Sequence, residues 1–343
     1  MTTSMADTTP TEVIGPPVPS GPAGADVPRV IVARVTGADR AFRALLRGGG
    51  LAVFGITGLI GGFLVFRSWS TFRVAGGRFF TTSTWLIGPN RFGIASVLPN
   101  GIVIALIALL IAVPCALTTA LFLSEYAPHA LKRPLIALID LMAAIPSIVY
   151  ALWGVFFLEP RMLGLARWLS DHAGFFPPFK VVGGDMQILF EFSPFIAGVV
   201  VSLMVIPIVT SISREVFAQA PPGEREGAYA LGASRWGMIR TVVLPYGRGG
   251  MIGAIMLGFG RAMGETIVIA LVVSPVYQFN WHVLHTGGLS IPSLIALWYG
   301  ESSPAMLSAL MAAGLVLFLL TLAVNALAGV IITGSRSGAQ SAD

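Results

Sequence analysis

Two residues of opposite charge, Arg261 and Glu265, lie four positions apart in an otherwise largely apolar stretch, GFGRAMGETIVIALVVSP. A charged side chain at the centre of a membrane costs about 2.5–3.5 kcal/mol to insert, so such a group must face water or the protein interior. The pair can be an ion pair that satisfies itself. Alternatively, the guanidinium can bind an oxyanion, while the carboxylate holds it in place or repels the anion. Arg before Glu is the weaker order for an ion pair at this spacing, which favours the anion site.

Further polar side chains that could contact an anion lie in ALIDLMAAIPSIVYALWGVFFL, residues 137–158. Ser147 and Tyr150 lie three residues apart beside Pro146, and their hydroxyls can donate to an anion or to a backbone carbonyl. Asp140 lies near one end of this stretch, where a carboxylate can reach water, and it is also a candidate for the substrate path. No set of reactive or metal-ligating residues accompanies them, so we predict neither catalytic residues nor a metal site.

The composition is that of a protein embedded in a membrane. Of its 343 residues, 55% are hydrophobic and only 11% are charged, and the mean hydropathy is +0.83. Soluble domains carry about 25% charged residues. The single cysteine, Cys115, cannot form an internal disulfide. We therefore expect a polytopic membrane protein that contacts lipid and binds no nucleic acid.

Six apolar stretches are long enough to cross a bilayer, which takes about 20 residues in a helix. They lie near residues 51–66, 97–123, 135–158, 194–212, 250–273 and 305–332. The predicted fold class is therefore all-α, with six transmembrane helices. Pro114, Pro146 and Pro207 are expected to kink the second, third and fourth of them.

The ends of the chain differ from this membrane domain, which we place at residues 51–333. Residues 1–28 are rich in Pro, Gly, Thr and Ser and are predicted to be a disordered tail. Residues 29–50 alternate arginines with apolar residues, which fits a solvated lead-in or a basic helix on an anionic leaflet. Residues 334–343 form a second tail. With both ends inside, thirteen Lys and Arg fall in inside segments and seven in outside loops, so the positive-inside rule favours cytoplasmic termini.

The most patterned inside loop is APPGEREGAYALGASRWGMIRTVVLPYGRGG, residues 220–250. The proline pair at 221–222 can begin a helix, and Gly232 can end it in a left-handed conformation. Ser234 can then cap a second helix, which we expect to close at residues 244–245, before the fifth span. The loop is either an ordinary amphipathic connector or a rigid docking element for a cytoplasmic partner.

This loop resembles the EAA loop of ABC-importer permeases. In that family Glu-Ala-Ala is followed by three residues, Gly, nine residues and Ile-x-Leu-Pro, and this spacing is matched throughout, with Gly227 in place of alanine and Val242 in place of isoleucine. The resemblance implies that the loop seats in a groove of an ATPase subunit. The coupling residues that it implies are Glu226, Ala228, Leu231, Gly232, Leu244 and Pro245.

Two further stretches, LMAAIPSIVYALWG at 141–154 and GRAMGET at 260–266, resemble the permease subunits of the Pst phosphate ABC importers. Together with LFLSEYAP at 121–128, the first is similar to the C-type subunits, PstC. The resemblance covers residues 96–333. It implies a type I ABC-importer permease (MetI-like) fold, import of inorganic phosphate, and roles for Arg261 and Glu265 in phosphate passage.

The resemblance also implies partners: a PstA-type permease, two PstB-type ATPase subunits that bind ATP and Mg, and a PstS-type phosphate-binding protein. This chain lacks the glycine loop with Lys-Ser/Thr that cradles nucleotide phosphates, so we expect a non-catalytic transport subunit of the bacterial inner membrane that binds no cofactor directly. A permease for another oxyanion or small solute, or an ATP-independent channel or carrier, is the alternative.

Overall fold

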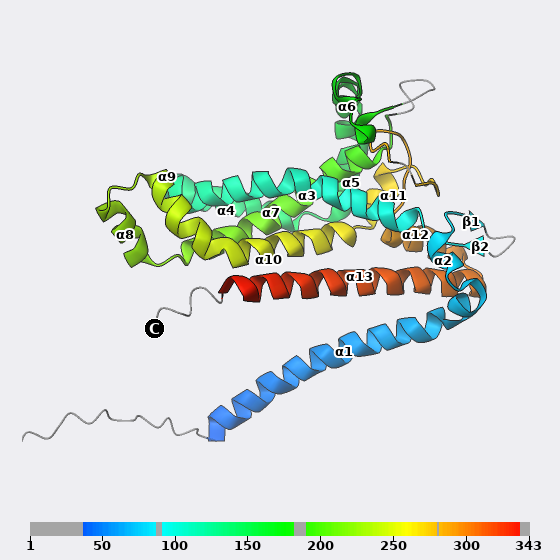
Figure 1. The fold of residues 1–343 in the computed structure, drawn as a ribbon, viewed down its shortest axis with the longest axis horizontal. Coiled ribbons are helices and arrows are strands. Elements are labelled where there is room, and N and C mark those ends of the chain that lie inside the picture. Colours follow the sequence, from blue (N-terminus) through cyan, green and yellow to red (C-terminus); the bar gives the residue numbers. More distant parts are fainter. Residues whose placement is uncertain (1–36, 87–90, 182–189, 280, 337–343) are drawn as a thin grey trace, which may run out of the picture. The chain divides into compact units, whose positions relative to one another are not determined.

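The structure is a computed structural model that describes residues 37–86, 91–181, 190–279 and 281–336 (Figure 1). The predicted tail at 1–28, residues 29–36 of the predicted interfacial segment and residues 337–343 of the second tail lie outside the described residues.

Within these ranges the chain is almost entirely helical. The α-helices are α1 (Gly37–Ala75), α2 (Arg78–Thr81), α3 (Val97–Leu121), α4 (His129–Ala144), α5 (Ser147–Trp153), α6 (Glu159–Ala173), α7 (Pro194–Ala218), α8 (Pro222–Ala230), α9 (Arg235–Met238), α10 (Leu244–Met263), α11 (Ile267–Val272), α12 (Ile291–Trp298) and α13 (Pro304–Arg336). π-Helical turns occur at η1 (Phe122–Tyr126), η2 (Gly154–Leu158) and η4 (Ile239–Val243), and 3-10 turns at η3 (Pro177–Phe179) and η5 (Tyr299–Glu301). Two short strands, β1 (Trp85–Leu86) and β2 (Arg91–Phe92), pair antiparallel.

The chain divides into two compact units, Met1–Ile56 and Thr57–Asp343. The described part of the first unit is the beginning of α1, residues 37–56, where every side chain is exposed. Helix α1 continues without a break through residue 50. The end of the predicted interfacial segment and the first predicted span therefore belong to one helix.

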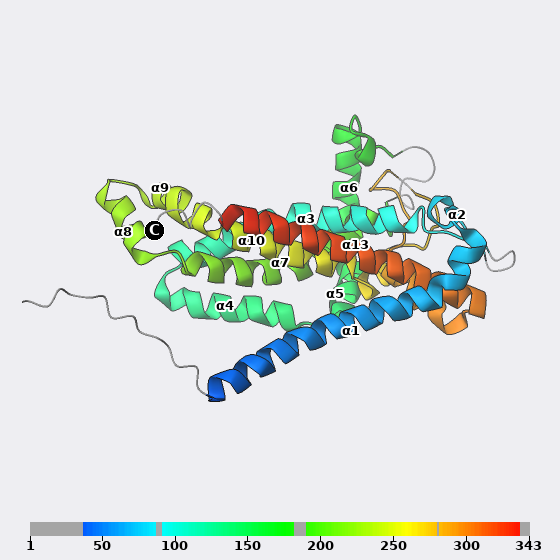
Figure 2. The same ribbon diagram turned by 60° about the horizontal axis from the view of Figure 1, so that its bottom comes forward.

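Helices α3, α7 and α10 lie side by side and form the core of the second unit (Figures 1 and 2). Because small side chains let helix backbones approach closely, the buried face of α3 explains this packing. Gly198 of α7 indicates how close the helices are, since a Cβ there would lie 2.5 Å from Cγ2 of Ile107. Four fully buried alanines of α3 recur every four residues: Ala108, Ala112, Ala116 and Ala120.

Helix α13 packs along α10, and near its start hydroxyl groups join it to the last turns of α1. Ser70 and Thr71 donate to Oγ of Ser308 at 2.6 and 2.9 Å, and Ser308 donates to a carbonyl of α1. In the apolar cluster at this end, Trp298 donates to the Tyr277 hydroxyl at 2.6 Å. Burial raises the pKa of the Tyr277 phenol, so it keeps its proton.

The prediction of six membrane-spanning helices is confirmed for the described residues, by length and composition. Three of the predicted spans, the second, fourth and sixth, agree with the structure within a few residues, while the first is longer and the third and fifth differ. The segments are Gly37–Ala75, Val97–Tyr126, Ser147–Ala173, Pro194–Ala218, Arg235–Met263 and Pro304–Ile332.

The third predicted span, residues 135–158, is wrong as a single helix. Helix α4 ends at Ala144 and α5 begins at Ser147. The residue before a proline is pushed out of the helical region, and Ile145, before Pro146, is extended at φ −65° and ψ 129°. Helix α4 packs along α7 and has no fully buried residue. The third membrane-length segment instead runs from Ser147 to Ala173, through α5, η2 and α6.

The fifth predicted span, residues 250–273, starts too late and contains a break. Helix α9, η4 and α10 run from Arg235 to Met263 as one segment, so Leu244 and Pro245 lie inside it and do not close the loop. The missing N–H of Pro245 falls just after the π-helical turn η4, where the regular ladder is already altered. The chain then leaves the helix at Gly264.

Candidate functional site

Arg261 lies in the last turn of α10, and its side chain is exposed. A cation in the last turn complements the negative end of the helix dipole. Helix α11, which follows, packs against α5. Tyr150, another predicted site residue, belongs to α5, so it lies on the helix that packs against the segment following Arg261.

Glu265 lies in the break between α10 and α11 and is only 8% exposed. Its Oε1 accepts a hydrogen bond from the N–H of Val268 at 3.3 Å, while its own N–H donates to the carbonyl of Ala262. The carboxylate thus satisfies a backbone donor at the start of α11 and forms no ion pair with Arg261. The two residues do not share one helix, so the predicted geometry of the pair is not found.

The hydroxyl-bearing candidates lie at the break between α4 and α5. Tyr150 donates its hydroxyl to the carbonyl of Met142 at 2.9 Å, which ties the two helices together. Ser147 opens α5 and is half-buried, and its hydroxyl has no hydrogen-bond partner among the described residues. Asp140 is exposed on α4 and accepts a hydrogen bond from Ser211 of α7 at 3.5 Å, so its described partner lies on α7.

The first predicted short helix in the loop at 220–250 is confirmed as α8, whereas the second, α9, is the beginning of the continuous segment that ends at Met263. Gly232 joins them with φ +84°, a conformation that residues with a Cβ rarely adopt. Ser234 accepts a hydrogen bond from the N–H of Gly237 at 3.1 Å and so caps α9 as predicted. Glu226 is exposed on α8, and Leu231, at the turn, is 92% exposed.

A buried ion pair, which the sequence did not indicate, holds α8 to the membrane helices. Arg225 of α8 donates from Nη1 to both carboxylate oxygens of Glu125 in η1, at 3.0 and 3.1 Å. The same guanidinium donates to the carbonyls of Phe217 and Ala220, at the end of α7. Glu125 is 5% exposed and Arg225 22%, so the pair is largely shielded from water.

This anchor ties three elements together at one guanidinium. Arg225 belongs to α8, and Glu125 lies in η1, directly after α3. The carbonyl of Phe217 lies in the last turn of α7, and that of Ala220 lies two residues after its end. Glu125 also accepts from the Ser124 hydroxyl at 2.6 Å, which fixes the carboxylate. We call Glu125 and Arg225 the loop anchor. The partners lie 100 positions apart, so no local pattern could have paired them.

Comparison with known proteins places these features in one family. The family model for the binding-protein-dependent transport system inner membrane component matches residues 112–336, which contain the loop anchor, α8, α9 and Arg261. The chain belongs to this family. The predicted all-α permease fold, with six membrane-length helices, is thereby confirmed, and the protein is a multi-pass inner-membrane transport subunit.

Curated relatives within the family cover most of the chain. Phosphate transport system permease protein PstC 2 of Mycobacterium tuberculosis is 38% identical over 304 residues, 88% of this chain and 93% of the relative. PstC of Xylella fastidiosa is 40% identical over 266 residues, 76% of this chain and 80% of the relative. The predicted resemblance to the PstC proteins is therefore confirmed.

A solved structure supports the fold independently of these relatives. A bacterial ABC transporter involved in the import of the acidic polysaccharide alginate superposes with a TM-score of 0.52 and 17% identity. The match covers 86% of this chain and 98% of the other. At this identity the likeness bears on the fold alone.

Proposed function

We propose that this chain is a permease subunit of an ATP-driven importer that carries inorganic phosphate into the cytoplasm. The observation that carries the proposal is the identity of 38–40% to proteins named phosphate transport system permeases. The exposed guanidinium of Arg261 supplies suitable chemistry, because its planar fork matches the oxygens of phosphate. Tyr150 and Ser147, on the neighbouring α5, are the candidates to complete the path.

The partners follow from the same proposal. A PstA-type permease would close the path beside Arg261, whose side chain is exposed in the single chain. Two PstB-type ATPase subunits would bind ATP and Mg and receive α8 and α9, and a PstS-type protein would deliver phosphate outside. Both chain ends would lie in the cytoplasm, in accord with the count of positive charges.

The route from the ATPase to the phosphate path runs along one helix. The segment from Arg235 to Met263 is continuous for 29 residues, or about 40 Å at 1.5 Å per residue. A displacement of α8 and α9 would therefore reach the turn that carries Arg261 directly. The loop anchor would pass the same displacement to α3 and α7, and the resulting tilt of the helices would open the path to one side at a time.

Substitution of Arg261 tests the proposal in the complete transporter reconstituted in lipid vesicles. Arg261→Ala should lower phosphate uptake about 30-fold or more, since a charge-assisted hydrogen bond contributes about 1.5–3 kcal/mol and transport needs it at each passage. Arg261→Lys should retain part of the uptake, because the charge stays while the fork is lost. Arg248→Ala removes an exposed arginine from the same helix and should leave uptake unchanged.

Two outcomes would count against this function. Normal phosphate uptake by Arg261→Ala would remove the anion site, while co-purification of all subunits would exclude failed assembly as the cause of a loss. The substrate is tested separately by adding the binding protein loaded with phosphate or with sulfate. ATP hydrolysis stimulated by sulfate and not by phosphate would assign the permease to another oxyanion.

A further inference from the structure

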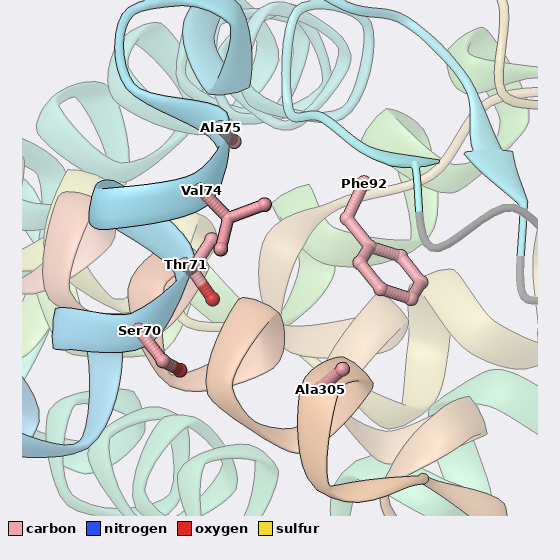
Figure 3. Close-up of a pocket in the computed structure, with 6 residues that line it drawn as sticks. All are labelled: Ser70, Thr71, Val74, Ala75, Phe92 and Ala305. Atoms are coloured by element: carbon pink, nitrogen blue, oxygen red, sulfur yellow. The ribbon is translucent and has the colours of Figure 1, made fainter.

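Two cavities with shared lining residues lie where α1 ends. The end of α1 lies away from α8 and α9 (Figure 1), and Figure 3 shows the first cavity. The first has a volume of about 200 Å³ and is mainly apolar, with the Ser70 and Thr71 hydroxyls on its α1 wall. Figure 3 shows Val74 of α1 and Phe92 of β2 extending toward the same space, with Ala305 of α13 below.

The second cavity adds positive charge to this apolar space. Its volume is about 430 Å³, and it shares Val74, Ala75 and Phe92 with the first. Its other lining residues are two arginines and two threonines: Arg78, Thr82, Thr84 and Arg91. Neither guanidinium has an ion-pair or hydrogen-bond partner among the residues that the structure describes.

The backbone that carries the two arginines is held by packing. Gly76, at φ +52°, turns the chain after α1 so that α2 begins at Arg78. Arg91 pairs with Leu86 in the short sheet, and its neighbour Phe92 packs on Trp85 with ring centroids 5.0 Å apart. The positions of both arginines are thus set by buried aromatic neighbours, while the side chains themselves are exposed.

Two arginines and two threonines line the second cavity, and such a set of donors suits a phosphate group, which offers several acceptor oxygens and negative charge. A soluble anion needs only the second cavity. A phospholipid would occupy both, with its phosphate between the arginines and the start of an acyl chain in the apolar space. The cavities also lie at the end of α1, a helix that is long and apolar enough to cross a membrane and therefore to bring this region near lipid.

We propose that Arg78 and Arg91 bind a phosphate group, carried by an anionic phospholipid whose acyl chain enters the neighbouring apolar cavity. The site is distinct from the phosphate path, because it is built by α1, α2, the short sheet and α13, whereas Arg261 lies at the break between α10 and α11. The proposal therefore stands or falls without regard to which substrate the transporter carries.

Native mass spectrometry of the purified full-length chain tests the site by titration with phosphatidylglycerol, phosphatidylcholine or inorganic phosphate. The double variant Arg78→Gln/Arg91→Gln should weaken binding of phosphatidylglycerol about 30-fold, because each of the two arginines near a lipid headgroup contributes about 1 kcal/mol. The matched double variant Arg73→Gln/Arg161→Gln also removes two exposed arginines but lines neither cavity, and it should bind as the unaltered chain does.

A third variant separates the two sources of phosphate. Ala305→Phe fills part of the apolar cavity and should weaken the binding of phosphatidylglycerol, while the binding of inorganic phosphate should not change. Inorganic phosphate binding that requires Arg78 and Arg91 but is unchanged in Ala305→Phe would support the phosphate site. The same result would contradict an anionic phospholipid as the molecule that carries the phosphate, if Ala305→Phe also left binding of phosphatidylglycerol unchanged. Equal losses of phosphatidylglycerol binding in both double variants, or no loss in Arg78→Gln/Arg91→Gln, would contradict a phosphate site at these two arginines.

Discussion

The positive charge of Arg261 is available because the helix that carries it ends two residues later, at Met263. Had α10 continued, Glu265 would lie one turn away on the same face and within reach of the guanidinium. Instead the carboxylate turns to the N–H of Val268 at 3.3 Å and is buried. One charge of the pair therefore stabilises the start of a helix, and the other stays exposed.

Substitution of Glu265 separates these two roles. Glu265→Gln keeps an acceptor for the N–H of Val268 and removes the charge, so phosphate uptake should stay within about threefold of the unaltered transporter. Glu265→Ala removes the acceptor and should lower the free energy of unfolding by about 1 kcal/mol, as the loss of a helix cap does. Uptake into vesicles and thermal unfolding of the complex measure the two effects.

The result for Glu265→Gln decides between capping and transport. If its uptake falls as far as that of Arg261→Ala, the negative charge itself takes part in phosphate passage. The capping role would then be insufficient, even though the hydrogen bond to Val268 is retained.

At the scale of elements, the loop anchor is the contact that makes α8 part of the membrane domain. A guanidinium that binds a carboxylate and two carbonyls is fixed in direction, since its donors form a rigid fork. Lysine could reach one of these acceptors but not all of them. The geometry therefore requires arginine at position 225.

Breaking the anchor should impair coupling more than binding of the partners. Arg225→Ala leaves the buried Glu125 carboxylate unpaired and should lower the free energy of unfolding by about 3 kcal/mol. ATP hydrolysis stimulated by the binding protein, together with phosphate uptake, should fall in the same variant. Glu125→Ala should have the same effects as Arg225→Ala. The double variant should be little less stable than either single variant, because the two residues act as one pair.

Arg235→Ala is the matched control for the anchor. Arg235 belongs to the same loop but lies exposed over the Tyr126 ring, 5.2 Å from its centroid, and such a contact contributes about 0.5–1 kcal/mol. Effects of Arg225→Ala and Glu125→Ala that simply add in the double variant would contradict the pairing. Full coupling in Arg225→Ala would contradict its role in transmission.

The prolines show what could be predicted about the elements and what could not. Hydropathy predicted the number of spans and located three of them within a few residues, but it gave no means of telling a kink from a break. Pro114 and Pro207 lie inside continuous helices, α3 and α7, which neighbours bury on several sides. Pro146 marks the end of a helix, because it forces Ile145, the residue before it, out of the helical region.

The site divides in the same way between local and tertiary causes. Gly232 and Ser234 were predictable, because a left-handed turn and a helix cap depend on adjacent residues. The loop anchor was not, since Glu125 and Arg225 meet only through the packing of α3 and α7. Glu265 was placed on the wrong element for a related reason, because the end of α10 at Gly264 has no strong signal in an apolar stretch.

At the scale of the second unit, α8 and α9 lie toward one end of α13, and the phosphate-binding cavities lie near its other end (Figure 1). Arg261 lies along the route between them, at the far end of the continuous segment that begins in α9. Because α13 packs on α10 along this length, a displacement of the loop would move both helices together. In the proposed function, docking of the ATPase at α8 and α9 is the step on which this displacement depends.

Leu231 offers the sharpest test of that docking. A leucine that is 92% exposed at a rigid turn is expected to bury its side chain in a partner, and such anchors commonly contribute about 2 kcal/mol or more to binding. Leu231→Asp should therefore weaken binding of the ATPase subunit to the reconstituted permease about 30-fold. The exposed side chain supports no other packing, so the thermal stability of the permease itself should not change.

The control adds the same negative charge elsewhere at this end of the molecule. Ala130→Asp places a carboxylate in the exposed first turn of α4, where the helix dipole tolerates it, and should leave ATPase binding intact. Equal losses in both variants would mean that added charge weakens assembly, and unchanged binding in Leu231→Asp would exclude the turn from the interface. A loss confined to Leu231→Asp would locate the ATPase at the turn between α8 and α9, where the segment leading to Arg261 begins.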